Sequence, residues 1–536
     1  MEQLKFSGRE IAFIALVCAL GIAARLLFFS GTDIAWDGAW HVMIAYKIAT
    51  VFWAQPLILA VCLAVAAVLA YLILVRRSVI AAGAAALALL FASLALHVPL
   101  TLHPRHPPLF NILASIGIFL TGLAPDVVGK LISTVALIAL AFFGLLLGVY
   151  LRDKKFGLVL FALLMLSPLS VFYSSTALLN PLEVALCYGS LVVFLFALRN
   201  SRLMPIAGAM FACAVATRYT AALIALAFAW LIFENRGWAL EKENRKNCAV
   251  FALICVAAMG AFLPAMLSSF GGYATWSAES SNYVSDMEHY SAQFVDAMGG
   301  EPLQQGTGFY PETLMFFLTP AAALLFIAGA LFAIRERNRT LLMLLLIFTA
   351  YLAFFTLASQ YMAPRYALGM EFPLMAVAAF GIARAWKMNR AAGIAALAAI
   401  ILLFAWQDAA LISGHNFRGL SEEMQKLPQG AKVYTSSLDP VRYYLGIYKT
   451  DTVVVNPFFS KLPGVPAQAR QEEQRLYYYV NTRLADVADS TDYVVATAVF
   501  FDTEDAAALE KFTPCAEIKS GTYTVFWVYA REKCPE

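Results

Sequence analysis

The sequence predicts an α-helical polytopic membrane protein with a small C-terminal α/β domain. Of its 536 residues, 61% are apolar and only 14% are charged. Apolar stretches long enough to cross a bilayer, which takes roughly 18 residues or more, follow one another up to residue 414. Charged residues become frequent after that point. We therefore expect a transmembrane domain over 1–414 and a soluble α/β domain outside the cytoplasm over 415–536.

The transmembrane domain contains thirteen candidate spans. They are 10–29, 56–75, 79–99, 127–150, 156–174, 180–198, 203–217, 219–233, 248–268, 313–333, 340–358, 364–385 and 391–411. The pair within 203–233 is unusually short. The apolar segment 109–122 is only 14 residues long, so we expect a re-entrant or interfacial helix there.

Loop charges set the expected orientation. With the N-terminus in the cytoplasm, the inside loops hold 19 of the 25 Lys and Arg residues before residue 415. This bias is the positive-inside rule, and it predicts a multi-pass protein of the plasma (inner) membrane. An odd number of spans then places the C-terminal domain on the extracytoplasmic side.

The six remaining cations fall at outer span ends or in outer loops, where orientation does not require them. They are Arg25, Lys47, Arg105, Lys130, Arg218 and Arg365. Because a cation next to hydrocarbon is costly, this placement predicts that an anionic ligand binds on the outer side. Snorkelling of arginines to lipid headgroups remains the alternative. Lys130 and Arg25 have a structural alternative as well, in salt bridges with Asp126 and Asp33.

The C-terminal segment has 13 Lys and Arg against 16 Asp and Glu. Short β-rich runs, "AKVYTSS", "DTVVVNP", "DYVVATAVF" and "TYTVFWVYA", alternate with helical patterns near 438–446, 468–481 and 504–512. "KSGTYT" is typical of a hairpin turn. Cys515 and Cys534 lie in this domain, where an oxidising compartment makes a disulfide possible and two free thiols are the alternative.

Five segments are expected on the outer face. They are 31–47 with Asp33 and Asp37, 100–122 with His103, Arg105 and His106, "YSSTALLNPLE" at 173–183, "ATRYT" at 216–220, and "QYMAPRYALGMEFP" at 360–373. The last segment contains Arg365, Tyr366 and, at least one turn deeper, Glu371. Prolines after His103 and His106 stiffen the second segment.

Carboxylates, cations and aromatic rings at the outer rim fit sugar transfer from a lipid-linked donor. The donor phosphate needs Arg or Lys to stabilise the charge that grows as it leaves. The acceptor hydroxyl or amine needs a carboxylate base, and aromatic side chains flank the sugar. A polyprenyl-phosphate sugar keeps its chain in the bilayer and its phosphate at the headgroup level. The hypothesis is therefore an inverting membrane glycosyltransferase.

Several short motifs resemble the GT-C superfamily of polytopic glycosyltransferases, in the branch of protein O-mannosyltransferases and lipid A aminoarabinose transferases. "DGAWHVMIA" at 37–45 is similar to that family's Asp-Glu-x-x-Tyr-x-x-x-Ala pattern, and "HPPLF" at 106–110 to its His-Pro-Pro-Leu-Tyr. "GLAPDVVGKLIS" resembles its Gly-then-Arg-Leu-x-Ser segment, with Lys130 in place of the arginine. "TRYT", "PRYALGMEFP" and the tail with "AKVYTSSLDPVRYYLG" resemble its later turns and its extracytoplasmic cap.

The resemblance implies that Asp37 is the catalytic carboxylate, with Asp33 as a second candidate. A loop acid or helix cap is the structural alternative for both residues. The family's second acid is Gly38 here, and the aromatic of the motif is His41. The remaining assignments follow from the outer-face segments: Arg365, Arg218 and Arg105 bind the donor phosphate, and His41, Trp40, His103, His106, Tyr366 and Glu371 bind substrate.

We expect a polyprenyl- or dolichyl-phosphate sugar donor, a protein or glycolipid acceptor, contacts with membrane lipids and no nucleic-acid partner. No cofactor is expected, although a divalent cation held by carboxylates and His41 is conceivable. The rival hypothesis is a transporter or flippase of a lipid-linked glycan. Transporters tend to place charges near the bilayer midplane and to show inverted repeats. This sequence shows neither feature.

Overall fold

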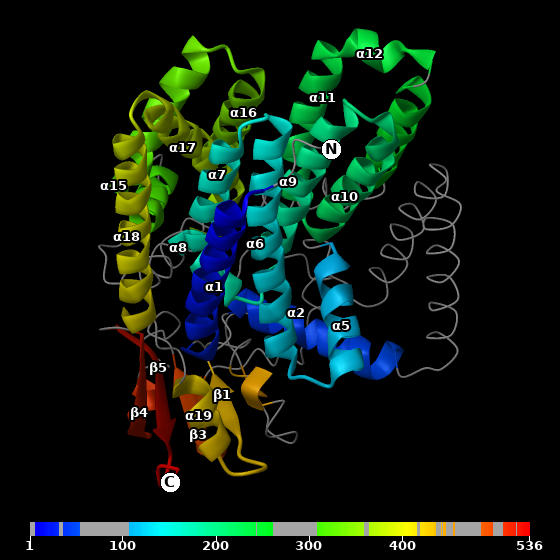
Figure 1. Ribbon diagram of the computed structural model, residues 1–536. Coiled ribbons are helices and arrows are strands. Elements are labelled where there is room, and N and C mark those ends of the chain that lie inside the picture. The colour runs from blue at the N-terminus through cyan, green and yellow to red at the C-terminus, as the bar shows by residue number, and fades with distance from the viewer. Residues whose placement is uncertain are drawn as a thin grey trace. The chain divides into compact units, whose positions relative to one another are not determined.

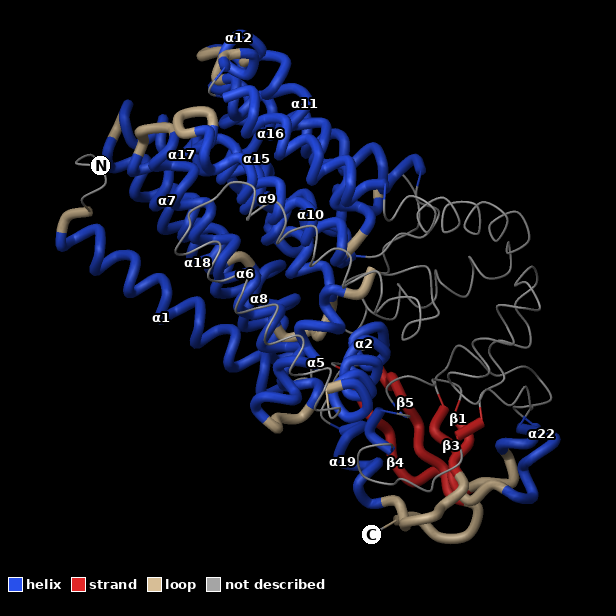
Figure 2. Tube along the Cα trace, turned by 90° about the vertical axis from the view of Figure 1, so that its right-hand side faces the viewer, coloured by secondary structure: helices blue, strands red, loops and turns tan. Residues whose placement is uncertain are grey.

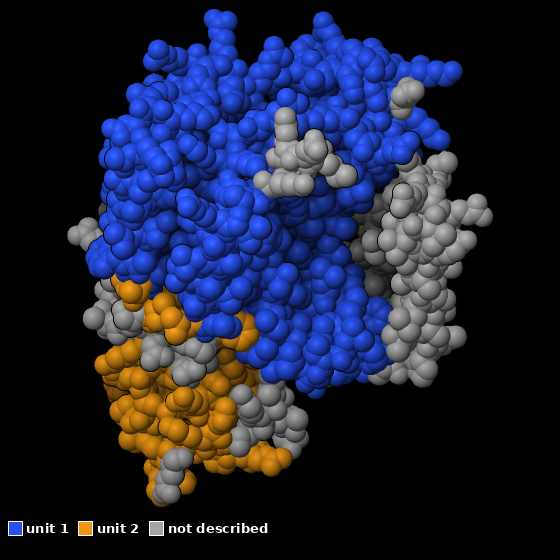
Figure 3. Space-filling model, in the orientation of Figure 1, with its two compact units in different colours: residues 1–26, 44–269, 307–408 blue, residues 27–43, 270–306, 409–536 orange. Residues whose placement is uncertain are grey.

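The computed structural model describes residues 6–31, 36–53, 107–242, 244–260, 308–358, 364–414, 419–435, 441, 443–445, 454–455, 484–496, 507–520 and 523–535. The chain forms two compact units (Figure 3). Unit 1 comprises 1–26, 44–269 and 307–408, and unit 2 comprises 27–43, 270–306 and 409–536. The domain division at residue 414 stays a prediction.

Seven helices of the described chain are long and apolar enough to cross a membrane, so the protein is a multi-pass membrane protein. They are α1 (Gly8–Gly31), α6 (Pro125–Tyr150), α9 (Leu179–Ala197), α15 (Phe309–Arg335), α16 (Arg339–Ala353), α17 (Leu368–Met388) and α18 (Arg390–Gly414). The pair α7 (Lys154–Leu166) and α8 (Pro168–Ser174), bent by 49°, makes up to eight. The spans expected at 56–75 and 79–99 lie outside the described residues, and the count of thirteen stays a prediction.

Two expected spans are short in the structure as well. They form α10 (Met204–Thr217) and α11 (Ala225–Glu234), joined by the 3₁₀ helix η4 (Tyr219–Ile224). The segment expected as a re-entrant or interfacial helix forms α5 (Leu109–Thr121), and Gly122 ends it with a φ of 65° that suits glycine. Residues 244–260 are helical, which overlaps the ninth predicted span.

Prolines and glycines explain the local geometry of unit 1. Pro168 cannot continue the hydrogen-bond ladder of α7, so the span predicted at 156–174 bends there instead of running straight. The backbones of α15 and α17 approach closely where Gly329 faces Gly381, and a Cβ at Gly329 would collide with the carbonyl of Val377. Small residues at such crossings let membrane helices pack by close backbone contact.

Loops at the two ends of unit 1 differ in charge. Successive spans run in alternate directions (Figures 1 and 2). One end, marked in both views by α12 (Arg236–Leu240), has the basic loops at 151–155, 199–202, 234–246, 335–339 and 384–390. The other end has the connections between α5 and α6, α8 and α9, and α10 and η4. We call it the site end. Placing it outside the cytoplasm stays a prediction from the charge bias.

The C-terminal part of unit 2 contains a five-stranded mixed sheet with strand order β2-β1-β3-β5-β4. The strands are β1 (Val433–Thr435), β2 (Val454–Val455), β3 (Tyr493–Ala496), β4 (Thr513–Ser520) and β5 (Tyr523–Ala530). Figure 2 labels β1, β3, β4 and β5. Four of the five match the predicted β-rich runs, and β4 was not predicted. β4 and β5 pair antiparallel around the expected hairpin turn. Tyr434 and Val494 pack with Leu484 and Phe512 in the sheet's core.

A disulfide joins Cys515 in β4 to Cys534, just beyond β5. The hairpin register explains why the two residues meet. Thr513 pairs with Ala530, and an irregularity between Pro514 and Ala516 displaces Cys515 from the regular ladder. The segment after β5 then returns beside β4, and the two Cα atoms lie 5.3 Å apart. The pairing that the sequence left open is therefore made.

Candidate functional site

Two arginines from distant parts of the chain meet on one aromatic ring at the site end of unit 1. The guanidinium carbon of Arg218 lies 4.4 Å from the ring centroid of Tyr366, and that of Arg365 lies 5.4 Å from the same centroid. Tyr366 is buried and stacks on Phe355, with the centroids 4.7 Å apart and the planes 17° from parallel. Cation–π contacts of this kind hold an arginine in a defined plane.

Local backbone breaks place both arginines. Arg218 ends α10 in an extended conformation with φ −159° and ψ 140°, before the tight η4 turn begins. Arg365 and Tyr366 lie in the 3₁₀ helix η6 (Pro364–Ala367), which Pro364 opens and which leads into α17. Each arginine thus lies at a helix end, so its guanidinium reaches the end of the bundle without passing through the packed interior.

Glu183 completes the group, and we call Glu183, Arg218, Thr220, Arg365 and Tyr366 the arginine cluster. One carboxylate oxygen of Glu183 lies 3.9 Å from Nε of Arg218, and the other accepts a hydrogen bond from the Thr220 hydroxyl. The Glu183 side chain is only 4% exposed. The cluster thus sets two guanidinium groups against one carboxyl group.

Sequence reasoning did not single out Glu183, although it quoted the segment that contains this residue. The available signal is a lone acid at the start of an apolar span, two residues after Pro181. Because ionisable residues inside a membrane span are rare and usually functional, Glu183 was a candidate by its position alone.

Glu371, which the sequence predicted to bind substrate, lies in a second cluster of buried polar side chains. Glu371 is fully buried in α17 and accepts hydrogen bonds from Ser167 and from Ser170, the latter at 2.8 Å. Both serines lie at the break between α7 and α8. Arg25 of α1 donates to the carbonyl of Met165 at 2.6 Å, and its charge attracts Glu371 and Asp408. Glu371 therefore ties the α7–α8 break to α17, and its predicted contact with substrate stays a prediction.

Replacing Glu371 with Leu is expected to destabilise the helix bundle by about 3 kcal/mol, because it leaves the buried Arg25 charge with one carboxylate fewer and two serines without an acceptor. The melting temperature of the purified protein in detergent measures the loss. Glu371→Gln keeps an acceptor for the serines and should fall between the wild type and Leu. A Leu variant that melts with the wild type would contradict this role.

Nζ of Lys130 lies 3.9 Å from a carboxylate oxygen of Asp126, one turn away on α6. This is the salt bridge expected as the structural alternative for Lys130. Arg25 contacts Gly21, Met165 and the Glu371 group, while Asp33, its suggested partner, lies outside the described residues. Thus the structure brings two of the six outer-rim cations, Arg218 and Arg365, onto one ring.

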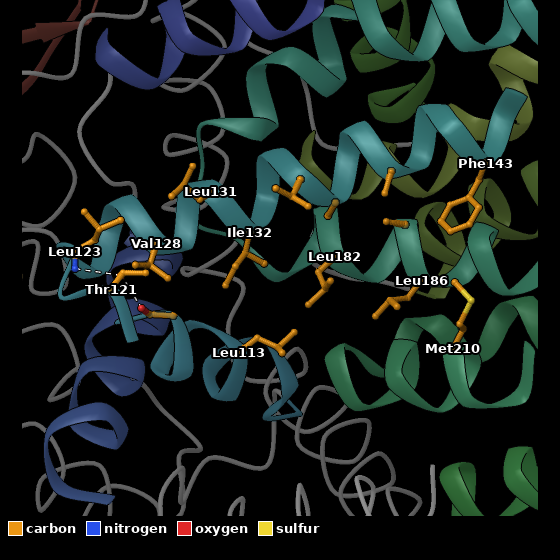
Figure 4. A pocket seen from close by; sticks show the side chains of 15 residues that line it. Leu113, Thr121, Leu123, Val128, Leu131, Ile132, Phe143, Leu182, Leu186 and Met210 are labelled. Carbon is orange, nitrogen blue, oxygen red and sulfur yellow. Dashed lines mark hydrogen bonds between the residues drawn. The ribbon is translucent and has the colours of Figure 1, made fainter. Parts of the chain in front are cut away.

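An apolar pocket of about 560 Å³ opens between α5, α6, α9 and α10 of unit 1 (Figure 4). Thr121 is its single side chain with a hydroxyl, and that hydroxyl is bonded to the Gly117 carbonyl. On α6 the pocket extends from Val128 to Phe143, about 22 Å at 1.5 Å per residue. Leu182 and Leu186 line it from α9, on either side of Glu183 in the sequence.

The first outer segment forms α2 (Trp36–Lys47), which contains Asp37, Trp40 and His41. His41 is buried within this helix, at 2% exposure. The side chains of Asp37 and Trp40 are not among those described, and Asp33, His103, Arg105 and His106 lie outside the described residues. Their predicted roles stay predictions. Within the described ranges, no three His, Cys, Asp or Glu side chains gather as metal ligands would.

No protein-family model and no curated protein matches the chain. Several solved structures are similar to it in fold. ArnT from Cupriavidus metallidurans in the apo state aligns with a TM-score of 0.60 at 12% identity, over 97% of this chain and 98% of that one. The same enzyme bound to undecaprenyl phosphate gives 0.58 at 12% identity, with the same coverage. The apo oligosaccharyltransferase of Archaeoglobus fulgidus gives 0.52 at 12% identity, over 98% and 74%.

At 12% identity this likeness shows the fold and does not show the reaction. It extends over nearly the whole chain, the C-terminal domain included. The chain therefore has the fold of the GT-C glycosyltransferases, the superfamily that its sequence motifs resemble.

Proposed function

We propose that the protein is a membrane glycosyltransferase that moves a sugar, with inversion, from a polyprenyl-phosphate-linked donor to an acceptor on the extracytoplasmic face. The observation that carries this proposal is the arginine cluster. It holds two guanidinium groups against one carboxylate at the site end of a bundle with the GT-C fold.

A phosphate is the anion that the cluster suits best. Guanidinium groups offer planar pairs of N–H donors that match phosphate oxygens, and they are more weakly hydrated than ammonium groups. Tyr366 holds both arginines before any ligand arrives, so they need little reorganisation when charge develops on the leaving phosphate.

The apolar pocket supports a donor with a long hydrocarbon chain. It begins at the same end of unit 1 as the arginine cluster and continues along α6 into the membrane-spanning part. Its lining would bury isoprene units without leaving polar groups unpaired. The structure of ArnT with bound undecaprenyl phosphate, which has the same fold, supports a carrier lipid of this class for the present chain.

In the proposed reaction, Asp37 takes the proton of the acceptor hydroxyl or amine as that atom attacks the anomeric carbon. The bond between this carbon and the phosphate oxygen breaks, and polyprenyl phosphate leaves with its negative charge stabilised by Arg218 and Arg365. Attack from the face opposite the phosphate inverts the anomeric centre. The acceptor is a protein or a glycolipid, recognised in part by the C-terminal domain.

Proteoliposomes that contain the purified protein test this function. With a radiolabelled polyprenyl-phosphate sugar on the accessible side, a transferase releases free polyprenyl phosphate and labels an acceptor fraction. A flippase moves the intact donor across the bilayer without cleaving it. Translocation of uncleaved donor, with no acceptor-dependent release of polyprenyl phosphate, would refute the proposal in favour of transport.

A further inference from the structure

We infer that Glu183, held by Thr220, is a positioning residue that fixes the Arg218 guanidinium for the donor phosphate. The inference rests on the proposed function and assigns a role to a residue that does not itself contact the donor. The ion pair between Glu183 and Arg218 is the contact that this role depends on.

Two side chains of the arginine cluster contact Arg218, and a third orients one of them. Glu183 lies beside Nε, the atom nearest the aliphatic stem, at 3.9 Å. The ring centroid of Tyr366 lies 4.4 Å from the guanidinium carbon of Arg218. The Glu183 carboxylate is in turn oriented by the Thr220 hydroxyl, two residues from Arg218 in the chain. Glu183 approaches Arg218 at Nε, and our inference assigns the terminal nitrogens of the guanidinium to the phosphate oxygens.

A carboxylate next to a phosphate site needs an explanation, because by charge alone it repels the ligand. If Glu183 were only a counter-charge that makes burial of Arg218 tolerable, its removal would raise the positive charge of the cluster and strengthen phosphate binding. If Glu183 positions Arg218, removing Glu183 frees the long side chain of Arg218. Ordering that side chain when phosphate binds then weakens phosphate binding. The two roles thus predict changes of opposite sign.

Two substitutions separate orientation from charge. Glu183→Gln and Glu183→Leu remove the same charge, but only Gln keeps an oxygen that can accept the hydrogen bond from Thr220. The probe is a fluorescent polyprenyl phosphate, with its Kd measured on the purified full-length protein in nanodiscs. Positioning predicts that Leu raises the Kd about tenfold and that Gln raises it by no more than about threefold. Equal or tighter binding by both variants would overturn the inference.

A double-mutant cycle shows whether Glu183 acts through Arg218. In an Arg218→Leu background, Glu183→Leu is expected to add little further loss, since the group it orients is gone. A general structural defect would instead weaken binding equally in both backgrounds, and this result would also overturn the inference. Thr220→Val, which removes only the hydroxyl that holds Glu183, should raise the Kd in the same direction as Glu183→Leu.

The control is Glu234→Gln, which disrupts the ion pair with Arg339 at 3.8 Å at the opposite end of the bundle. Its Kd should equal that of the wild type. Failure of the proposed function looks different from failure of this inference. A wild-type protein that does not bind polyprenyl phosphate refutes the function, whereas normal wild-type binding with an unaffected Glu183→Leu variant refutes only the positioning role.

Discussion

Replacement of Asp37 by Asn is expected to abolish sugar transfer, lowering kcat by about 10³-fold or more, while donor binding stays within about twofold of the wild type. The Asn side chain keeps the size of Asp but cannot take the acceptor proton, so the chemical step fails and the phosphate contacts remain. Single-turnover transfer of radiolabelled sugar measures the first quantity, and the Kd for polyprenyl phosphate measures the second.

Asp126→Asn is the matched control for Asp37→Asn. Asp126 pairs with Lys130 one turn away on α6, so its variant should transfer sugar at close to the wild-type rate. Asp33→Asn discriminates between the two candidate bases of the first outer segment. If Asp37→Asn transfers sugar normally and Asp33→Asn does not, the base is Asp33 and the motif assignment is wrong.

Arg218→Leu and Arg365→Leu are each expected to lower kcat/KM by about 10²-fold, because in the proposed mechanism each removes one of the two guanidinium groups that stabilise the leaving phosphate. The lysine variants keep the charge but lose the planar pair of donors, so they should recover only part of the activity. Both kcat/KM and the Kd for polyprenyl phosphate should change, since the contacts exist in the bound state and strengthen as the phosphate leaves.

Arg199 provides a matched control for the arginine variants. It lies over the Tyr150 ring at 4.3 Å, nearly the distance between Arg218 and Tyr366, but at the basic end of the bundle. Arg199→Leu thus removes an equivalent contact between an arginine and a tyrosine, and activity should remain. Loss of transfer in all three Leu variants would mean that such contacts serve stability and that the phosphate binds elsewhere.

Hydropathy alone identified most of the membrane architecture. A span needs only enough consecutive apolar residues, and that requirement is local in the sequence. For this reason the predicted spans 127–150, 180–198 and 313–333 agree closely with α6, α9 and α15. The span at 156–174 was also found, but a run of apolar residues does not reveal the bend that Pro168 introduces between α7 and α8. In the C-terminal domain, alternating runs predicted four strands, whereas β4 with "TPCAEIKS" has too few apolar residues to signal a strand by itself.

The distribution of charge was also readable from the sequence. It places Arg218 and Arg365 at one end of the bundle, because loop charges and span lengths fix how deep each residue lies. Which of these residues meet depends on how the helices pack. Tyr366 joins two arginines from different helix ends, and Glu371 reaches Ser170 across 201 residues of chain. Membrane helices are apolar on nearly every face, so their sequences do not encode which faces pack together. That choice depends on small residues such as Gly329 and Gly381 and on a few buried polar contacts, which become visible only when the helices are assembled.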